Sequence, residues 1–263
     1  MQNAAIAALG LNWRYVAFDV HPVHLGEAIA GAKRLGFVGL NLTVPHKLLA
    51  MEMVDELDVS AKTWGAVNTI RFELDEAGYV IARGFNTDAD AITRSLKEDL
   101  ELELRGASVL LLGAGGAGRT AALKLASEGV SELNLVNRTR SKAEEIAAEI
   151  KENFPAVRVS VDYPASEVDL ILNATSLGLK TEDALPFDGK QFPLKQARAA
   201  YDMIYRPAET PFLAAAKAAG CRTANGLGML LYQGAKALEI WSDKSAPIAV
   251  MRAALEKNVY GKK

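Results

Sequence analysis

Apolar residues occur in short runs along the whole chain, but the spacing of these runs changes near Ser108. Beyond that point, continuous apolar runs alternate with amphipathic segments. A strand that is buried on both faces reads as a continuous apolar run, and parallel strands need crossover connections between them. The pattern beyond Ser108 therefore predicts a doubly wound α/β layer with a parallel sheet.

The individual elements of this layer follow from the same pattern. Helices are predicted over Thr120–Ser127 and Ser141–Asn153, and in the second Ser141 is the expected N-cap with Glu144 three residues later. Strands are predicted over Ser108–Leu112, Glu132–Val136, Val157–Val161, Val168–Asn173 and Ala199–Ile204.

The region before Ser108 also alternates between strand-like and helix-like segments. Strands are predicted over Trp13–Val20 and Phe37–Val44, with a helix over Leu25–Arg34 between them. Alternation of this kind is typical of a parallel α/β layer. We therefore expect a second, smaller α/β domain here.

A hairpin and two helices complete the predicted elements. The strands Val67–Phe72 and Tyr79–Phe85 flank Asp-Glu-Ala-Gly, which has the composition of a turn. The C-terminal segments Met229–Trp241 and Pro247–Asn258 are helical in pattern. The pattern leaves two places open for them, on the nucleotide domain or back against the first region.

Composition and charge exclude several classes of protein. The 263 residues are 50% hydrophobic, and 30 basic against 32 acidic residues give a net charge of −2. Such a balance does not favour a nucleic-acid or membrane partner, and no apolar run approaches the roughly 20 residues of a membrane span. Because Cys221 is the single cysteine, no intrachain disulfide can form. We expect a cytoplasmic protein and assign no metal-ligating residues.

A glycine-rich turn follows the predicted strand Ser108–Leu112 and opens a helix. Gly113, Gly115 and Gly118 fit the pattern G-x-G-x-x-G. In dinucleotide-binding folds these glycines make the tight turn, let the backbone approach a pyrophosphate, and permit close helix–strand packing. The same glycines also occur in plain strand-to-helix connectors. The strand–turn–helix context favours a dinucleotide site.

The end of the next predicted strand bears on which dinucleotide is bound. An NAD site usually carries Asp or Glu there, to bind the ribose 2′-hydroxyl. This chain has Asn137, Arg138, Thr139 and Arg140 instead, followed by Lys142. Cations suit a 2′-phosphate, so the sequence predicts NADP. The alternative is a solvated loop and helix start.

Three clusters of polar residues each follow an apolar stretch of the first region. They are Asn41–Lys47, Gly65–Thr69 and Gly84–Asp88. Their amides, hydroxyls, lysine and carboxylate suit a small ligand rich in hydroxyl groups. Each residue alone has a plain structural explanation, because Asn and Asp are common in turns and at helix caps.

Taken together, the motifs resemble the shikimate dehydrogenase family, which includes shikimate/quinate dehydrogenases. The matching segments span almost the whole chain in family order. They are Asn41–Lys47, Gly65–Thr69, Gly84–Asp88, Gly113–Ala117, Asn137–Thr139, Asn173–Ser176, Tyr201–Tyr205 and Gly226–Gln233.

The resemblance implies a two-domain α/β protein, with a Rossmann-like NADP-binding domain and a smaller α/β substrate domain completed by C-terminal helices. It implies a substrate domain over residues 1–87, a dinucleotide-binding domain over 88–223, and returning helices over 224–263. Lys47 and Asp88 would be the catalytic pair. The implied substrate residues are Thr43, Asn68, Tyr205 and Gln233. The implied cofactor residues are Gly113, Ala114, Gly115, Gly116, Ala117, Asn137, Arg138, Thr139 and Lys142, with Met203 and Gly226 near the nicotinamide.

One departure from the family concerns the beginning of the chain. Family members carry a first strand and a Ser-x-Ser segment before the residues that match Met1 to Ala4, and this sequence starts after them. We expect either a longer natural protein or a form that lacks part of the substrate site. The same segment helps to separate shikimate from quinate users, so that choice stays open.

The activity that the resemblance implies is reversible reduction of 3-dehydroshikimate to shikimate by NADPH, in aromatic amino-acid and chorismate biosynthesis. Lys47 would donate the proton while Asp88 orients it, or Lys47 would stabilise developing charge with water as the proton route. Two alternatives remain: a quinate/shikimate dehydrogenase, and a non-catalytic protein that binds NADP or a metabolite. An acid/base pair favours the enzyme.

Overall fold

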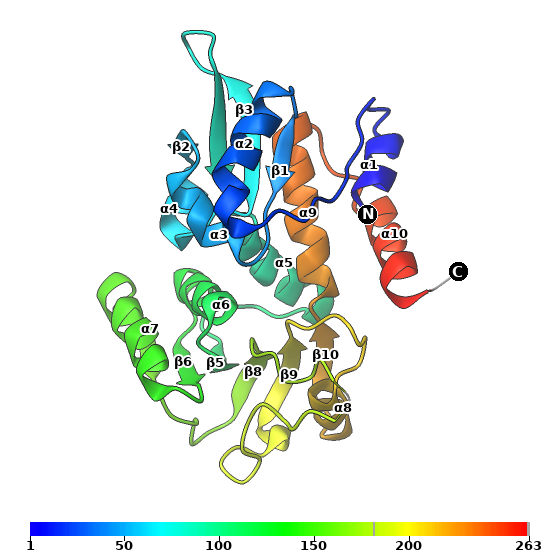
Figure 1. The fold of residues 1–263 in the computed structure, drawn as a ribbon. Helices are drawn as coiled ribbons and strands as arrows, with labels where there is room; N and C mark the ends of the chain where they lie inside the picture. The colour runs from blue at the N-terminus through cyan, green and yellow to red at the C-terminus, as the bar shows by residue number, and fades with distance from the viewer. Residues whose placement is uncertain (181, 262–263) are drawn as a thin grey trace. The chain divides into compact units, whose positions relative to one another are not determined.

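The computed structural model describes residues 1–180 and 182–261 (Figure 1). The chain forms two compact units. Unit 1 consists of Met1–Asp88 and Leu231–Lys263, and unit 2 consists of Ala89–Leu230. Two chain segments that are far apart in the sequence therefore build unit 1.

Unit 1 contains a four-stranded sheet with the strand order β1-β3-β4-β2. Its strands are β1 (Gly39–Asn41), β2 (Glu56–Leu57), β3 (Thr69–Leu74) and β4 (Val80–Phe85). The β1–β3 and β3–β4 pairs are antiparallel, and only β2–β4 is parallel. The predicted parallel layer is therefore wrong, because the hairpin that the sequence also predicted occupies the centre of the sheet.

The hairpin turn follows from its side chains. Asp75 accepts hydrogen bonds from the backbone N–H groups of Ala77 and Tyr79, at 3.0 and 2.7 Å. Gly78 has φ +84°, a conformation that glycine adopts without steric cost. The hairpin is confirmed, although β3 starts two residues later than predicted.

The predicted strand Trp13–Val20 is wrong, since this segment has no strand assignment. Side chains hold it instead. Asn3 exchanges two hydrogen bonds with the backbone of Tyr15, both at 2.8 Å, and the His46 ring bonds the carbonyl of Val20. Alternating apolar residues make a strand only where a neighbour completes the hydrogen-bond ladder.

The rest of unit 1 is mostly helical. The helices are α1 (Gln2–Ala8), η1 (Pro22–His24), α2 (Leu25–Arg34), α3 (His46–Leu49), η2 (Ala50–Glu52), α4 (Val59–Trp64) and α10 (Ile248–Tyr260). Helices α2 and α4 pack against the sheet. The first and the last helix lie side by side, since α1 packs on α10 (Figure 1). The predicted strand Phe37–Val44 shortens to β1, and α3 follows it.

The C-terminal helix α9 (Leu227–Ser242) begins in unit 2 and continues into unit 1. The indole N–H of Trp241 donates to the carbonyl of Ile70 on β3, at 2.9 Å. Arg71 bonds the carbonyl of Ile240 and both carboxylate oxygens of Asp243. The last part of the chain is thus fastened to the central hairpin of unit 1.

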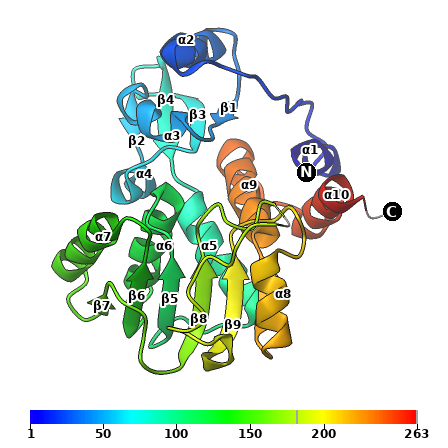
Figure 2. The same cartoon turned by 60° about the horizontal axis from the view of Figure 1, so that its bottom comes forward.

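Unit 2 contains a six-stranded sheet in which every neighbouring pair is parallel. Its strand order is β10-β9-β8-β5-β6-β7, and Figure 2 labels the strands from β9 to β7. The chain runs outward from β5 in one direction and from β8 in the other, so the topological switch point lies between these two strands. The strands are β5 (Ser108–Leu112), β6 (Glu132–Val136), β7 (Arg158–Ser160), β8 (Val168–Asn173), β9 (Ala197–Asp202) and β10 (Arg222–Asn225). The predicted doubly wound, Rossmann-like fold is confirmed.

Two helix starts in unit 2 differ from the prediction. Helix α6 (Gly116–Ser127) begins inside the glycine turn and not at Thr120, because Gly115 already serves as its N-cap. Helix α7 (Arg140–Asn153) takes Thr139 as its N-cap, so Ser141 lies within the first turn. Neither N-cap forms a side-chain capping hydrogen bond, so these two helices start without the capping signal that a sequence can display. The remaining helices are α5 (Asp88–Leu100), η3 (Leu194–Gln196) and α8 (Pro211–Ala218).

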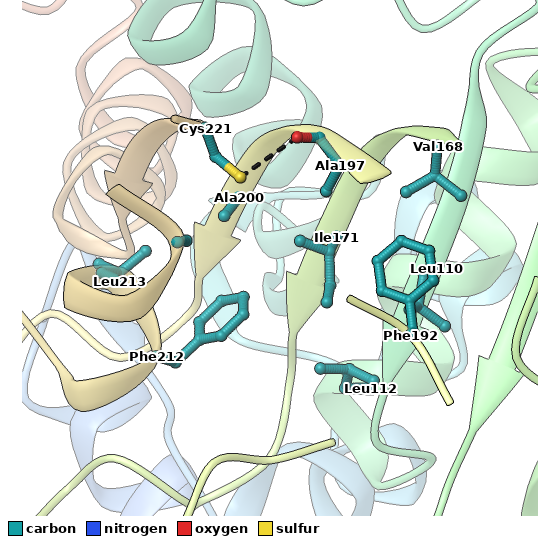
Figure 3. Packing of buried hydrophobic residues seen from close by; sticks show 11 residues of the cluster. Leu110, Leu112, Val168, Ile171, Phe192, Ala197, Ala200, Phe212, Leu213 and Cys221 are labelled. Carbon is teal, nitrogen blue, oxygen red and sulfur yellow. Dashed lines mark hydrogen bonds between the residues drawn. The ribbon is translucent and has the colours of Figure 1, made fainter. Parts of the chain in front are cut away.

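A hydrophobic cluster on one side of this sheet joins β5, β8 and β9 to α8 (Figure 3). Leu110, Ile171 and Phe212 are almost completely buried in it. The thiol of Cys221 lies at its edge and donates to the carbonyl of Ala197, at 3.2 Å. Burial raises the pKa of this thiol. Cys221 therefore belongs to the core.

Candidate active site

The glycine turn lies at the switch point of the unit 2 sheet. Gly113 has φ +104°, and a Cβ there would lie 3.0 Å from the backbone of Ala174, which follows β8. A Cβ on Gly118 would lie 2.1 Å from the carbonyl oxygen of Gly113. These two glycines are thus required by backbone conformation and close packing.

Gly115 and Gly116 are different, because no such contact requires them. Both are exposed, and a Cβ on either would meet no described atom within 4 Å. Their lack of side chains leaves open space over the start of α6, where unpaired N–H groups and the helix dipole favour an anion. Ala114 and Ala117 complete this turn. The turn therefore has the shape and polarity that a pyrophosphate needs.

Asn137 connects the glycine turn to the end of β6. Its side-chain oxygen accepts the N–H of Ala114 at 3.1 Å, and its amide donates to the carbonyl of Thr139 at 2.8 Å. One side chain thus fixes two of the loops that the sequence assigned to the cofactor. Asn137 has a positioning role in addition to any contact with a ligand.

The cations after β6 have different surroundings. Arg140 is paired with Glu144 and Asp162, with N–O distances of 2.9 Å for each. Arg138 and Lys142 are exposed, and neither side chain forms a hydrogen bond or an ion pair with another described residue. Arg138 and Lys142 are therefore the cations that remain available to a 2′-phosphate.

Met203 and Gly226 come together in unit 2, as the predicted nicotinamide contacts require. A Cβ on Gly226 would lie 2.0 Å from the carbonyl oxygen of Met203. The Gly226 N–H donates to the carbonyl of Ile204, at 3.2 Å. Tyr205 follows in the same loop, with 38% of its surface exposed. Two segments separated by more than twenty residues thus meet at one place.

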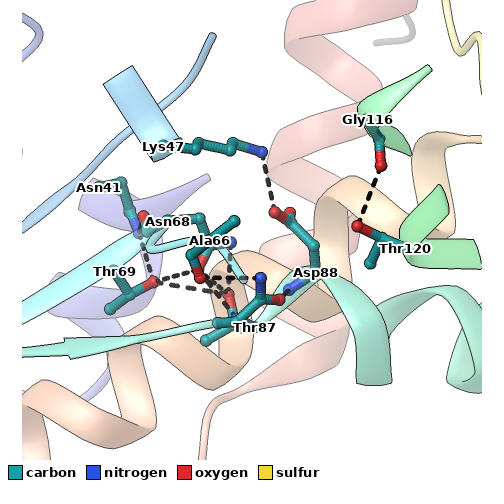
Figure 4. Close-up of polar contacts among 10 residues, drawn as sticks. Asn41, Lys47, Ala66, Asn68, Thr69, Thr87, Asp88, Gly116 and Thr120 are labelled. Atoms are coloured by element: carbon teal, nitrogen blue, oxygen red, sulfur yellow. Dashed lines mark hydrogen bonds and ion pairs between the residues drawn. The ribbon is translucent and has the colours of Figure 1, made fainter. Parts of the chain in front are cut away.

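In unit 1, the ammonium of Lys47 lies 2.8 Å from a carboxylate oxygen of Asp88 (Figure 4). The two side chains are 27% and 14% exposed, so the pair is partly shielded and still accessible. Lys47 projects from the short helix α3, and its carbonyl accepts the N–H of Val67. Asp88 donates its N–H to the side chain of Asn86. The structure therefore brings together the two residues that were predicted to carry the chemistry.

A buried polar network extends beside this pair (Figure 4). Asn68 is 1% exposed, and its side chain donates to the Thr87 hydroxyl and accepts the Thr87 N–H, both at 2.9 Å. The Thr69 hydroxyl donates to Asn68 and accepts from Asn41. Asn68 thus has interior partners, and its predicted contact with substrate stays a prediction.

The sequence prediction named Asn68 but omitted its partners Thr87, Thr69 and Asn41. All three stand in the polar motifs that the sequence displays, so a signal was present. What was missing is the pairing of β1 with β3 and of β3 with β4, which juxtaposes these motifs. Thr87 is the most relevant addition, because it precedes Asp88 directly.

The other predicted substrate residues are Thr43, Gln233 and Tyr205. Thr43 is exposed in the turn before α3, where its carbonyl accepts the N–H of His46 at 2.8 Å. Gln233 lies half-buried on α9 within unit 1. Tyr205 belongs to unit 2.

The described residues contain no group of three or more His, Cys, Asp or Glu side chains that could hold a metal ion. Among the same residues, no helix combines the length and the apolar surface needed to cross a membrane.

Three family models match the chain in order. Residues 1–70 match the shikimate dehydrogenase substrate-binding domain, and residues 95–179 match shikimate/quinate 5-dehydrogenase. Residues 226–256 match the shikimate 5′-dehydrogenase C-terminal domain. These matches contain six of the eight motif segments described above, and Gly84–Asp88 and Tyr201–Tyr205 lie outside them.

Similar proteins extend the match to nearly the full length. Shikimate dehydrogenase (NADP(+)) from Methanopyrus kandleri is 40% identical over 262 residues, covering 97% of this chain and 89% of the relative. A shikimate dehydrogenase solved in complex with NADP+ is 38% identical, with a TM-score of 0.86 and coverage of 98% and 89%. The ligand-free 5-ketofructose reductase of a Gluconobacter strain is 36% identical, with a TM-score of 0.84 and coverage of 97% and 91%.

Proposed function

This chain belongs to the shikimate dehydrogenase family, and from that membership we propose that it catalyses the reversible, NADP-dependent reduction of 3-dehydroshikimate to shikimate. The observation that carries the proposal is the Lys47–Asp88 ion pair beside a buried network of amides and hydroxyls. A protein that only binds a metabolite has no need of a lysine held in this way. The reaction would belong to aromatic amino-acid biosynthesis. Its cytoplasmic location and its lack of a nucleic-acid partner remain predictions from composition.

The residues of unit 2 fit an NADP molecule. Gly113 to Ala117 would hold the pyrophosphate against the start of α6, and Asn137 and Thr139 would line the adenosine ribose. Arg138 and Lys142 would pair with the 2′-phosphate. Met203 and Gly226 would contact the nicotinamide. The support is the space left open over Gly115 together with the two exposed cations.

When bound, NADPH supplies the hydride that reduces the substrate ketone. As the carbonyl carbon becomes tetrahedral, negative charge develops on its oxygen and a proton must reach it. The Lys47 ammonium can donate a hydrogen bond to that oxygen and then transfer the proton. Asp88 accepts from Lys47 at 2.8 Å and so directs the ammonium. In the reverse direction, Lys47 would accept the proton of the hydroxyl.

Substrate binding would use the polar groups next to this pair. A ring that carries several hydroxyls needs donors and acceptors in fixed positions, because an unpaired polar group costs about 1–3 kcal/mol when buried. Thr43, Asn68 and Gln233 of unit 1 are proposed to supply them, and Tyr205 of unit 2 remains a predicted substrate residue. The network around Asn68 would hold Thr87 and Asp88 in place for the same ligand.

A substrate and cofactor matrix tests the proposal. Absorbance at 340 nm would follow the oxidation of shikimate and of quinate with NADP+ and with NAD+, and the reduction of 5-ketofructose with NADPH. We expect turnover with shikimate and NADP+ to exceed every other combination. A clear preference for quinate or 5-ketofructose would overturn the proposal that shikimate is the substrate. A preference for NAD+ would overturn the proposal that NADP is the cofactor. Binding of NADP+ without turnover of any substrate would favour the non-catalytic alternative.

A further inference from the structure

Asp202 is an ionisable residue of unit 2 to which the proposed mechanism gives no role. It ends β9 and is 0% exposed. Burial raises the pKa of its carboxyl group. A buried carboxylate persists only where several donors compensate the loss of water. The donors of Asp202 therefore indicate what the residue is for.

Three donors surround the carboxylate, and each belongs to a different segment. One oxygen accepts the side-chain amide of Asn173 and the backbone N–H of Ile204, both at 3.0 Å. The other oxygen accepts the Thr210 hydroxyl at 2.6 Å. Asn173 ends the neighbouring strand β8 in register with Asp202, and Thr210 is the N-cap of α8. The carboxylate thus joins the carboxyl ends of two strands to the start of a helix.

The Ile204 N–H matters most, because it fixes the backbone directly after β9. Met203 donates its own N–H to the carbonyl of Asn173, at 2.9 Å. The carbonyl of Ile204 accepts the N–H of Gly226, and Gly226 packs on the carbonyl of Met203. The close approach of Met203 and Gly226 therefore depends on a turn that Asp202 holds from inside.

Asn173 carries the same network toward the glycine turn. Its side-chain oxygen accepts the N–H and the hydroxyl of Thr175, at 3.0 and 2.7 Å. Its amide also donates to the carbonyl of Leu177. The backbone of Ala174, within the same loop, packs against Gly113. The network thus spans both sides of the switch point, where ligands of doubly wound sheets bind.

We infer that Asp202 is a positioning residue: its carboxylate fixes the backbone on which Met203 and Gly226 meet the nicotinamide end of the cofactor. This inference rests on the proposed cofactor site. Asp202 does not touch the reacting atoms. It acts through the turn after β9, so its loss should impair the nicotinamide end of the bound cofactor and spare the adenosine end.

The test compares Asp202→Asn with Asp169→Asn. Asp169 lies on β8 of the same sheet and also accepts three hydrogen bonds, from Ser108 N–H, the Ser108 hydroxyl and Arg198. It lies near the amino end of its strand, away from the end where the glycine turn follows β5. The two variants therefore separate a general loss of sheet stability from a loss of position. The ligands are NADP+ and 2′,5′-ADP, which carries the phosphorylated adenosine and lacks the nicotinamide.

For Asp202→Asn we expect weaker binding of NADP+ and unchanged binding of 2′,5′-ADP. We also expect kcat to fall by about 10–100-fold, since a small misplacement of reacting groups can cost roughly 10²-fold, while KM for shikimate changes little. Asp169→Asn should alter none of these. Equal losses for both ligands, or the same losses in Asp169→Asn, would overturn the inference. If either result were found while the wild-type enzyme is active, the inference about Asp202 would fail and the proposed function would still stand.

A milder pair of variants keeps the inference testable if Asp202→Asn folds poorly. Thr210→Val removes one donor to the carboxylate, and Thr210→Ser retains it. Thr210→Val should weaken NADP+ binding and lower kcat, as Asp202→Asn does. Thr210→Ser should leave both at the wild-type level. Identical behaviour of the two Thr210 variants would contradict the inference. Failure of the wild-type protein to bind NADP+ would instead refute the proposed cofactor site itself.

Discussion

Three features of unit 1 fix the position of Lys47. Its ammonium bonds Asp88, its carbonyl accepts from Val67, and it stands on the four-residue helix α3. A second lysine–aspartate pair, Lys33–Asp55, has the same N–O distance of 2.8 Å elsewhere in the unit. Asp55 also accepts the N–H of Ala82. The two pairs allow a controlled test of the proposed catalytic pair.

Lys47→Ala is expected to lower kcat by about 10²-fold or more, the size of effect for a lost general acid. KM should change less, because the amide and hydroxyl groups of the site remain. Steady-state kinetics with shikimate and NADP+ would measure both. Lys33→Ala is the matched control and should leave kcat unchanged. Near-wild-type turnover of Lys47→Ala would remove the lysine from the mechanism.

Asp88→Asn separates charge from shape at the other member of the pair. The amide fills nearly the same volume but cannot hold the ammonium as a carboxylate does. We expect kcat to fall while the protein stays folded, as circular dichroism would show. Asp55→Asn, at the control pair, should leave kcat unchanged. A fully active Asp88→Asn variant would mean that the ion pair is dispensable.

Arg138 and Arg140 allow a similar comparison for the cofactor. Arg138→Ala should weaken NADPH binding by about 1.5–3 kcal/mol, the range of hydrogen bonds to charged groups. NADH binding should hardly change, since NADH lacks the 2′-phosphate. Arg140→Ala should affect both cofactors little, because Arg140 already pairs with Asp162 and Glu144. Fluorescence titration measures the four affinities. Equal losses of NADPH and NADH in Arg138→Ala would indicate that Arg138 supports the loop.

Among elements, the glycine turn with α6 shows that glycines of one motif serve different purposes. Gly118 packs against the carbonyl of Gly113, whereas Gly115 faces open space. Gly115 also has φ −81°, which any L-residue adopts. Gly118 is therefore required by close packing, whereas Gly115 is the exposed N-cap of α6, where glycine leaves the backbone open.

Gly118→Ala should consequently impair mainly the stability of the protein, whereas Gly115→Ala should impair mainly the binding of NADP+. Gly118→Ala should lower the free energy of unfolding by about 1–3 kcal/mol, as overpacking does. Gly115→Ala should lower it by no more than about 1 kcal/mol, since alanine is a poorer N-cap than glycine, but it should weaken NADP+ binding, because the new methyl group would occupy the space proposed for the pyrophosphate. Urea unfolding and NADP+ titration of both variants measure these effects. Normal NADP+ binding by Gly115→Ala would place the pyrophosphate elsewhere.

At the scale of the molecule, unit 1 depends on contacts between its two chain segments. The Trp241 indole is 8% exposed, and its N–H reaches the Ile70 carbonyl across 171 positions of sequence. Its ring also lies where a side chain on Gly39 would be, so β1 needs a glycine at that point. Helix α9 thus contributes to the core of unit 1, whose other chain segment is Met1–Asp88.

Trp241→Phe is expected to destabilise the protein by about 0.5–1.5 kcal/mol through the lost hydrogen bond, with a further loss from the cavity that the smaller ring leaves. Trp13→Phe is the control, because Trp13 lies half-buried in a segment without strand pairing. It should change the free energy of unfolding by less than ~0.5 kcal/mol. Chemical unfolding followed by circular dichroism tests both. Equal effects would mean that Trp241 does not anchor the helix.

Where the sequence misled, the missing information was long-range. Trp13–Val20 has the composition of a strand, but no described neighbour completes a ladder with it. The first region was expected to be parallel, and its hairpin made the sheet mixed instead. Strand pairing is non-local, so the apolar pattern of one segment cannot specify its partner.

The sequence by itself indicated the glycine turn and the cations after β6, because each is a short motif whose chemistry is local, and it offered Lys47 and Asp88 as a catalytic pair through the family resemblance. Only the tertiary structure showed that Arg140 is paired with Asp162 whereas Arg138 forms no ion pair with a described residue, and that Lys47 reaches Asp88 across 41 positions. It also revealed Asp202 as the buried centre of a network. The physical reason is that a residue type fixes what a group can donate or accept, whereas its partners and its exposure to water depend on which distant segments the fold brings together.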